Sequence, residues 1–119
     1  MANQKRGRLR LQENVRSDGA NRVMELVRAI NKSYEGTLTA GNSPILINFY
    51  SAQGFNSIQG WINNDGIGDI LVAFSRDGVT FGDNWTMKQG ELSNLKGFDI
   101  HTLRLTRVAA DANYRVVLI

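Results

Sequence analysis

Residues 69–78 read DILVAFSRDG. The run over residues 70–74 is apolar on both faces, as is typical of a central strand that is covered on both sides. Asp77-Gly78 then supplies the positive φ that a tight turn requires. The stretch therefore predicts a buried strand that ends in a turn, and the same combination recurs on both sides of it.

Apolar or alternating segments separated by turn residues fill the chain from residue 44 onward. Turn sequences stand at residues 41–44, 63–66 and 89–91, which read GNSP, NNDG and QGE. The expected strands cover residues 45–50, 57–62, 69–75, 79–81, 85–88, 98–108 and 113–119. About six or seven short strands, with a turn every eight to twelve residues or so, are typical of an antiparallel sandwich or small barrel. We predict a mainly β, antiparallel, jelly-roll-like β-sandwich over residues 44–119.

The last expected strand, residues 113–119, is rich in Val, Leu and Ile up to its final residue. Such a strand is stable only when its backbone is paired. We expect it either to lie inside the sheet or to pair with another subunit.

The first quarter of the chain differs from the rest in charge. Residues 1–32 carry eight basic and three acidic side chains, a net charge of +5, whereas residues 33–119 carry six and eight, a net charge of −2. Residues 1–16 show no helical or strand periodicity and are predicted to form a flexible basic arm. Residues 17–43 are predicted to hold a short helix and a connecting loop, with a strand over residues 22–27 as the alternative. The apolar residues on one face of that helix are Val23, Met24, Leu26, Val27 and Ile30.

Composition excludes several classes of protein. The chain has 119 residues, the length of one domain, and no cysteine, so it contains no disulfide, thiolate metal site or cysteine nucleophile. Its longest apolar runs, of about five residues, are much shorter than the roughly 20 residues that a membrane helix needs. The first dozen residues are polar and basic and predict no secretory signal peptide.

The sequence contains no recognisable catalytic set. His101 is the single histidine and is expected to share a strand face with Leu103 and Leu105, which favours a structural role over metal binding or general base catalysis. The oxygen-rich residues 63–69 could suggest calcium, but Trp61 stands where an EF-hand loop places its first ligand. A hairpin turn is the favoured interpretation there. We predict a protein that is not an enzyme and binds no cofactor or metal.

Trp61, Trp85 and Tyr114 are the candidate ligand or interface aromatics. Their rings could stack on sugars, as in a carbohydrate-binding adhesion module. No aromatic row follows one strand face at fixed spacing, however, and Trp and Tyr in small sandwiches are usually core or interface residues. A core or interface position is therefore favoured.

The arm mixes basic and apolar side chains and is the candidate partner-docking segment. Its docking residues are predicted to be Lys5, Arg6, Arg8, Leu9, Arg10 and Leu11. Clustered charges can contact nucleic-acid phosphates. A protein partner is favoured over nucleic acid, because Leu9, Leu11 and Val15 interleave with the charges and could anchor the arm in an apolar groove.

A characteristic order of short motifs runs from residue 44 onward. The motifs are WINNDG at 61–66, GDILV at 68–72, SRDG at 75–78, QGE at 89–91, IHTLRL at 100–105 and YRV at 114–116. This order resembles small β-sandwich virion proteins of tailed bacteriophages, of the capsid-decoration, fibre, neck or tail type.

The resemblance implies a structural role in the virion, assembled in the host cytoplasm, with no catalytic motif. It favours a capsid decoration (cement) subunit that forms a homo-oligomer and docks on the major capsid protein through the basic arm. A neck, tail or fibre position is the alternative within the same class.

Overall fold

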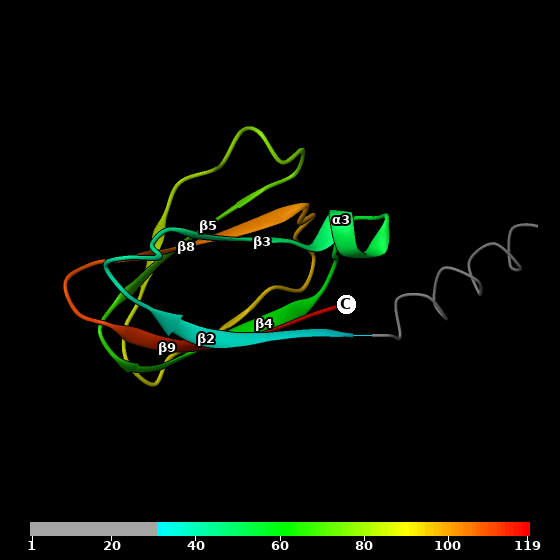
Figure 1. The fold of residues 1–119 in the computed structure, drawn as a ribbon. Helices are drawn as coiled ribbons and strands as arrows, with labels where there is room; N and C mark the ends of the chain where they lie inside the picture. Colours follow the sequence, from blue (N-terminus) through cyan, green and yellow to red (C-terminus); the bar gives the residue numbers. More distant parts are fainter. Residues whose placement is uncertain (1–30) are drawn as a thin grey trace, which may run out of the picture. The chain divides into compact units, whose positions relative to one another are not determined.

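The computed structural model describes residues 31–119, which form two four-stranded antiparallel sheets and one short helix (Figure 1). The first sheet has the order β2-β9-β4-β7, with strands at Lys32–Leu38, Ala112–Leu118, Gly60–Ile67 and Leu92–Asn94. The second has the order β3-β8-β5-β6, with strands at Ile45–Asn48, Thr102–Arg107, Ile70–Ser75 and Trp85–Met87. Helix α3 spans Phe49–Gln53. The predicted mainly β, antiparallel fold is confirmed, and the two sheets fit a β-sandwich.

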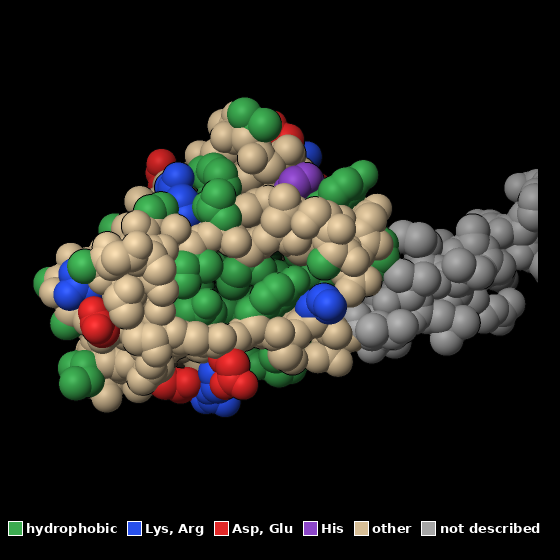
Figure 2. Space-filling model, viewed as in Figure 1, with side chains coloured by type: hydrophobic (Ala, Val, Ile, Leu, Met, Phe, Trp, Pro, Cys, Tyr) green, Lys and Arg blue, Asp and Glu red, His purple; other side chains and the backbone are tan. Residues whose placement is uncertain are grey.

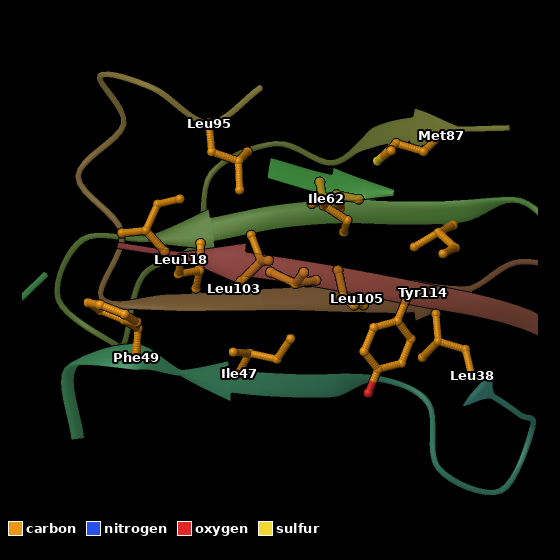
Figure 3. Packing of buried hydrophobic residues seen from close by; sticks show 14 of the residues in the cluster. Leu38, Ile47, Phe49, Ile62, Met87, Leu95, Leu103, Leu105, Tyr114 and Leu118 are labelled. Atoms are coloured by element: carbon orange, nitrogen blue, oxygen red, sulfur yellow. The ribbon is translucent and has the colours of Figure 1, made fainter. Parts of the chain in front are cut away.

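One apolar core lies between the two sheets. On β4 and β9 every second side chain is buried, because successive residues of a strand point to opposite faces of its sheet. Figure 3 shows side chains from both sheets meeting in this core, among them Ile62, Tyr114 and Leu118 of the first sheet and Ile47, Leu103 and Leu105 of the second.

The C-terminal strand β9 lies inside its sheet, paired with β2 on one side and with β4 on the other. Its register with β2 runs from Leu118 opposite Lys32 to Ala112 opposite Leu38. Of the two alternatives that the sequence leaves open for this strand, pairing within the chain is therefore the one observed.

Strand β2 corrects the predicted start of the sandwich. The sequence predicts a connecting loop up to residue 43, whereas residues 32–38 form an edge strand. Only Tyr34 and Leu38 in this segment are large and apolar, so the strand is specified by its pairing with β9 rather than by its own alternation. The helix expected within residues 17–30 and the arm expected over residues 1–16 lie outside the described residues.

Helix α3 replaces the end of the strand expected over residues 45–50. Asn48 caps the helix, because its Oδ1 accepts a hydrogen bond from the Ser51 N–H at 2.9 Å. Gly54 ends it with a left-handed φ of 86° and donates its N–H to the Tyr50 carbonyl at 2.7 Å. The turn places Phe49 in the core, where its ring packs edge-on against Phe55.

Residues 63–66, where the sequence predicts a tight turn, belong to strand β4. The strand bulges at Asp65, between the pairs Asn64–Tyr114 and Gly66–Asn113. Gly66 has a φ of 100°, which favours glycine, and a Cβ there would lie 2.6 Å from the Gln89 side chain. The hairpin prediction is wrong because β4 and β5 belong to different sheets, so the chain crosses between the sheets after residue 67.

The boundaries of the other strands differ less from those that the sequence predicts. The strand expected over residues 98–108 is confined to Thr102–Arg107, and residues 79–81 contribute a single bridge, between Ser75 and Phe81. The short strand β7 is not anticipated by the sequence. The strand within residues 85–88 is confirmed, as is the turn at residues 89–91, which the Glu91 N–H closes by donating to the Lys88 carbonyl at 3.0 Å.

The buried amide of Asn64 holds the bulge and the crossing together. Its Nδ2 donates to the carbonyl oxygens of Gly68 and Met87, both at 2.9 Å, and its Oδ1 accepts from the Gly66 N–H at 2.8 Å. Its backbone N–H and C=O bond to residues 91 and 90 of the turn after β6. A residue of the first sheet thereby fixes the crossing to β5 and the end of a strand in the second sheet.

Replacing Asn64 by alanine should lower the free energy of unfolding by about 3 kcal/mol, because several buried backbone groups lose their hydrogen-bond partner at once. Denaturant unfolding followed by circular dichroism measures this loss. The control is Asn63→Ala, on the opposite face of β4, which should cost under about 1 kcal/mol. Equal losses for the two variants would contradict the role assigned to Asn64.

Candidate functional site

The arm residues that were predicted to dock a partner lie outside residues 31–119, so no geometry is described for them. They are Lys5, Arg6, Arg8, Leu9, Arg10 and Leu11. The three candidate aromatics do lie in the described part of the chain, and the fold places them in three different environments.

Trp61 projects from the outer face of β4, with 43% of its surface exposed. It stands beside a hollow of about 210 Å³, which Gln59, Asn94 and Lys96 also line. Asn94 is its cross-strand partner on β7. Amide and ammonium groups beside an open indole face can donate hydrogen bonds to a polar ligand that stacks on the ring.

Trp85 lies at the edge of the second sheet and packs against the core. Its Nε1 donates to the Ser93 hydroxyl of β7 at 3.2 Å, a bond that joins the two sheets. Its ring meets Phe98 edge-on, with centroids 6.2 Å apart. Trp85 therefore helps to close the sandwich and is only partly accessible.

Tyr114 is a core residue, with 8% of its surface exposed. It lies on the central strand β9, and its phenol packs over Gly36 of the neighbouring strand, where a Cβ would lie 3.0 Å from the hydroxyl oxygen. Burial raises the pKa of the phenol. Of the core and interface positions that the sequence favours for this aromatic, Tyr114 takes the core one, because every second residue of β9 points into the core.

A larger hollow, of about 580 Å³, lies beside the loop over residues 76–84, the yellow-green loop at the top of Figure 1. Its apolar lining is Phe74 and Phe81, and its charged lining is Arg76, Asp77 and Asp99. The sequence does not predict this site, because only the fold brings Asp99 to the other lining residues, which all lie within residues 74–82. We call this site the loop hollow.

Aromatic rings build the apolar part of the loop hollow. Phe74 stacks on Phe98, with centroids 4.9 Å apart and planes 16° from parallel. The Arg104 guanidinium lies over the Phe81 ring, 4.6 Å from its centroid. One face of the Phe81 ring is thus already occupied by a cation of the same chain.

Two carboxylates and one guanidinium supply the polar part. The backbone N–H groups of Thr80 and Val79, followed by the Ser75 hydroxyl, lower the pKa of Asp77 to about 2. Arg76 Nε lies 3.5 Å from Asp99 Oδ2, in an ion pair whose side chains are both well exposed. The formal charges of the lining therefore sum to −1, from two carboxylates and one guanidinium.

His101 contacts helix α3, strand β8 and the loop over residues 76–84. Its ring stacks on Tyr50 of α3, with centroids 4.7 Å apart, and its Nδ1 lies 2.8 Å from the Thr102 hydroxyl. Gly78 of the 76–84 loop packs so closely that a Cβ there would lie 2.6 Å from the ring. These contacts place the histidine in a packing position between helix, strand and loop.

The edge strands β2 and β3 leave apolar side chains visible between them (Figure 2). Asn42 Nδ2 donates to the Thr37 carbonyl at 2.8 Å and closes one end of the β2 edge. The Tyr34 hydroxyl is buried without a hydrogen-bond partner in the described part of the chain, and burial raises its pKa. Most of the β2 edge pairs with no other strand of residues 31–119.

Comparison with protein-family models, curated proteins and solved structures finds no match to this chain. Residues 31–119 contain no group of three His, Asp or Glu side chains placed to hold a metal ion. The same residues include no helix of the length and apolarity needed to span a membrane.

Acid unfolding tests the turn around Asp77. Its pKa is about 2 in the fold and 3.8 in an ordinary carboxyl, so the unfolded chain binds the proton more tightly. Asp77 therefore stabilises the fold above about pH 4, and this contribution is lost as the pH falls toward about 2. Asp77→Asn should flatten the pH dependence of the unfolding free energy in this window, as measured by urea unfolding. The control Val79→Ala, in the same loop, should keep the original slope, and an unchanged slope for Asp77→Asn would refute the assignment.

Proposed function

We propose that the chain is a non-enzymatic virion structural protein of the jelly-roll type, and specifically a capsid decoration subunit. In this role it forms a homo-oligomer on the major capsid protein and stabilises the shell. A neck, tail or fibre position is the alternative within the same class. The observation that carries the proposal is the order of the strands.

The orders β2-β9-β4-β7 and β3-β8-β5-β6 place the last strand beside the first strand of residues 31–119 and interleave early and late strands in both sheets. Jelly rolls are eight-stranded, double-sheet folds built from two Greek keys, and they are common in viral capsid proteins and lectins. Because one fold can host many functions, the surface must also suit assembly.

The surface supports an assembly role in two ways. Large apolar side chains are exposed on both sheets and on the loops, namely Leu46, Tyr50, Ile58, Trp61, Ile67, Val79, Leu92 and Val108. Apolar side chains and open sheet edges are groups that subunit interfaces bury. The opposite net charges of residues 1–32 and 33–119 also favour attraction between neighbouring copies.

Decoration requires no single strong contact. A subunit wedged between capsid proteins must be displaced before the shell ruptures, and copies linked to one another bind with avidity. Many modest contacts, spread over the apolar residues and the arm, are sufficient for this mechanism.

The purified full chain should bind emptied capsids and raise their rupture temperature, as measured by sedimentation with capsids and by thermal release. Leu9→Ser together with Leu11→Ser should weaken binding about tenfold or more, because an apolar anchor is lost while the charge is kept. Gln12→Ser with Asn14→Ser is the matched control and should bind normally. Absence of binding at micromolar concentration would contradict the decoration role.

Trp61 favours a second candidate function, that of a carbohydrate-binding adhesion module. The indole of Trp61 is more accessible than that of Trp85. Gln59, Asn94 and Lys96 supply hydrogen-bonding groups beside it. Lectins also use jelly-roll folds. Trp85, by contrast, is held by Ser93 and Phe98 and contributes to the fold.

The sugar-binding candidate predicts a hit on a glycan array that Trp61→Ala removes while the unfolding free energy changes little. Trp85→Ala is the comparison, and it should lower the unfolding free energy because it removes core packing and the bond to Ser93. An array without a hit, or a hit that survives Trp61→Ala, would eliminate this candidate.

A further inference from the structure

We infer that the loop hollow is the docking site for the arm of a second copy, and that it takes the Arg-Leu-Arg-Leu stretch at residues 8–11. The inference rests on the proposed function and deepens it, because it names the partner and the surface through which subunits join. It is argued from the chemistry of the lining and from the composition of the arm.

The apolar lining suits leucine and the flat face of a guanidinium. Phe74 and Phe81 line the hollow, and the Arg104 guanidinium occupies one face of Phe81, 4.6 Å from the centroid, so the arm contacts the remaining ring surface. Aromatic faces attract guanidinium groups, while the rings also offer apolar surface to an aliphatic side chain.

The carboxylates have capacity for a further cation. The hydrogen bonds that Asp77 accepts all end on Oδ1, so in the described part of the chain its Oδ2 is left to accept one from a partner. Asp99 Oδ1 accepts from Asn56 Nδ2 at 3.0 Å and its Oδ2 pairs with Arg76 at 3.5 Å, where the Asp99 and Arg76 side chains are 52% and 77% exposed. An exposed ion pair of this kind contributes little stability, so an incoming guanidinium can share or replace it.

The arm matches the loop hollow in composition. Residues 5–11 read KRGRLRL, which alternates guanidinium groups with leucines in its second half. The lining of the hollow contains two carboxylates and two aromatic rings. Residues 1–32 carry a net +5 and residues 33–119 a net −2, so the charges of arm and body are complementary.

The proposed contact is heterologous, since the donating segment precedes β2 in the first sheet and the accepting hollow borders β5 in the second. Contacts of this kind link copies head to tail and produce rings or extended arrays. An array of linked subunits is the arrangement from which a decoration protein gains avidity.

Sedimentation velocity of the full chain over a range of concentrations tests the inference without any capsid. The unaltered chain should self-associate as its concentration rises. Arg8→Gln with Arg10→Gln, and separately Asp99→Asn, should each weaken self-association about tenfold to a hundredfold, because charge-assisted hydrogen bonds are lost. Phe81→Ala should weaken it as well.

Matched controls separate this contact from general charge and from folding. Arg22→Gln with Arg28→Gln removes the same charge outside residues 8–11 and should weaken self-association far less than Arg8→Gln with Arg10→Gln. Thr86→Ala, which is exposed on β6 of the second sheet, should leave self-association unchanged. Asp99→Asn alters no apolar contact, and its thermal unfolding should match the parent, so a loss of association in this variant reports on docking.

Mixing two deficient variants gives the sharpest readout. The arm variant Arg8→Gln/Arg10→Gln keeps an intact hollow, and the hollow variant Phe81→Ala/Asp99→Asn keeps an intact arm. A head-to-tail contact predicts that each is monomeric alone and that the mixture forms a one-to-one dimer, which cannot grow further. A mixture that stays monomeric, or an unaltered chain that stays monomeric at all concentrations, would overturn the inference.

Failure here is distinguishable from failure of the proposed function. If the chain binds emptied capsids but does not self-associate through the loop hollow, the docking inference falls and the decoration role stands. If it self-associates as described but binds no capsid, the contact stands and the decoration role falls.

Discussion

The amide of Asn64 is the constraint on which much of this sandwich depends. It is buried, and it satisfies carbonyl groups of Gly68 and Met87 together with the N–H of Gly66. A buried amide that lost these partners would carry a large desolvation cost, so the network forms as a unit. Because Met87 belongs to the opposite sheet, one side chain of β4 sets the spacing of the two layers at that end.

The Asn64 network also determines which sheet edges and which loop lie on the surface. With β4 held in its bulge, the chain crosses to the second sheet after residue 67 and β9 fills the place between β2 and β4. The C-terminal strand is thereby used inside the fold, while β2 and β3 remain as edges. The loop over residues 76–84, anchored by Asp77 and packed on His101, forms the loop hollow at the margin of the second sheet.

The sequence predicts those features that depend on neighbouring residues. The buried strand at residues 70–75 is apolar on both faces, and the turn at Gly90 follows from local chemistry. The tight turn expected at residues 63–66 fails because the partners of Asn64 lie up to 27 residues further along the chain. The burial of Tyr114 depends on the pairing of β9 with β2 and β4, which come from distant segments, and the loop hollow forms only where Asp99 meets residues 74–82. Contacts between distant segments therefore determine both the features that the sequence does not predict and the candidate site.

We propose that this chain is a structural component of a virion, with the sandwich as its body and residues 1–16 as its attachment. The most direct measurement is the molar ratio of this chain to the major capsid protein in purified particles, determined by quantitative mass spectrometry. For a decoration subunit we expect a molar ratio close to one, because such subunits cover the whole shell. Particles that lack the chain would contradict the claim.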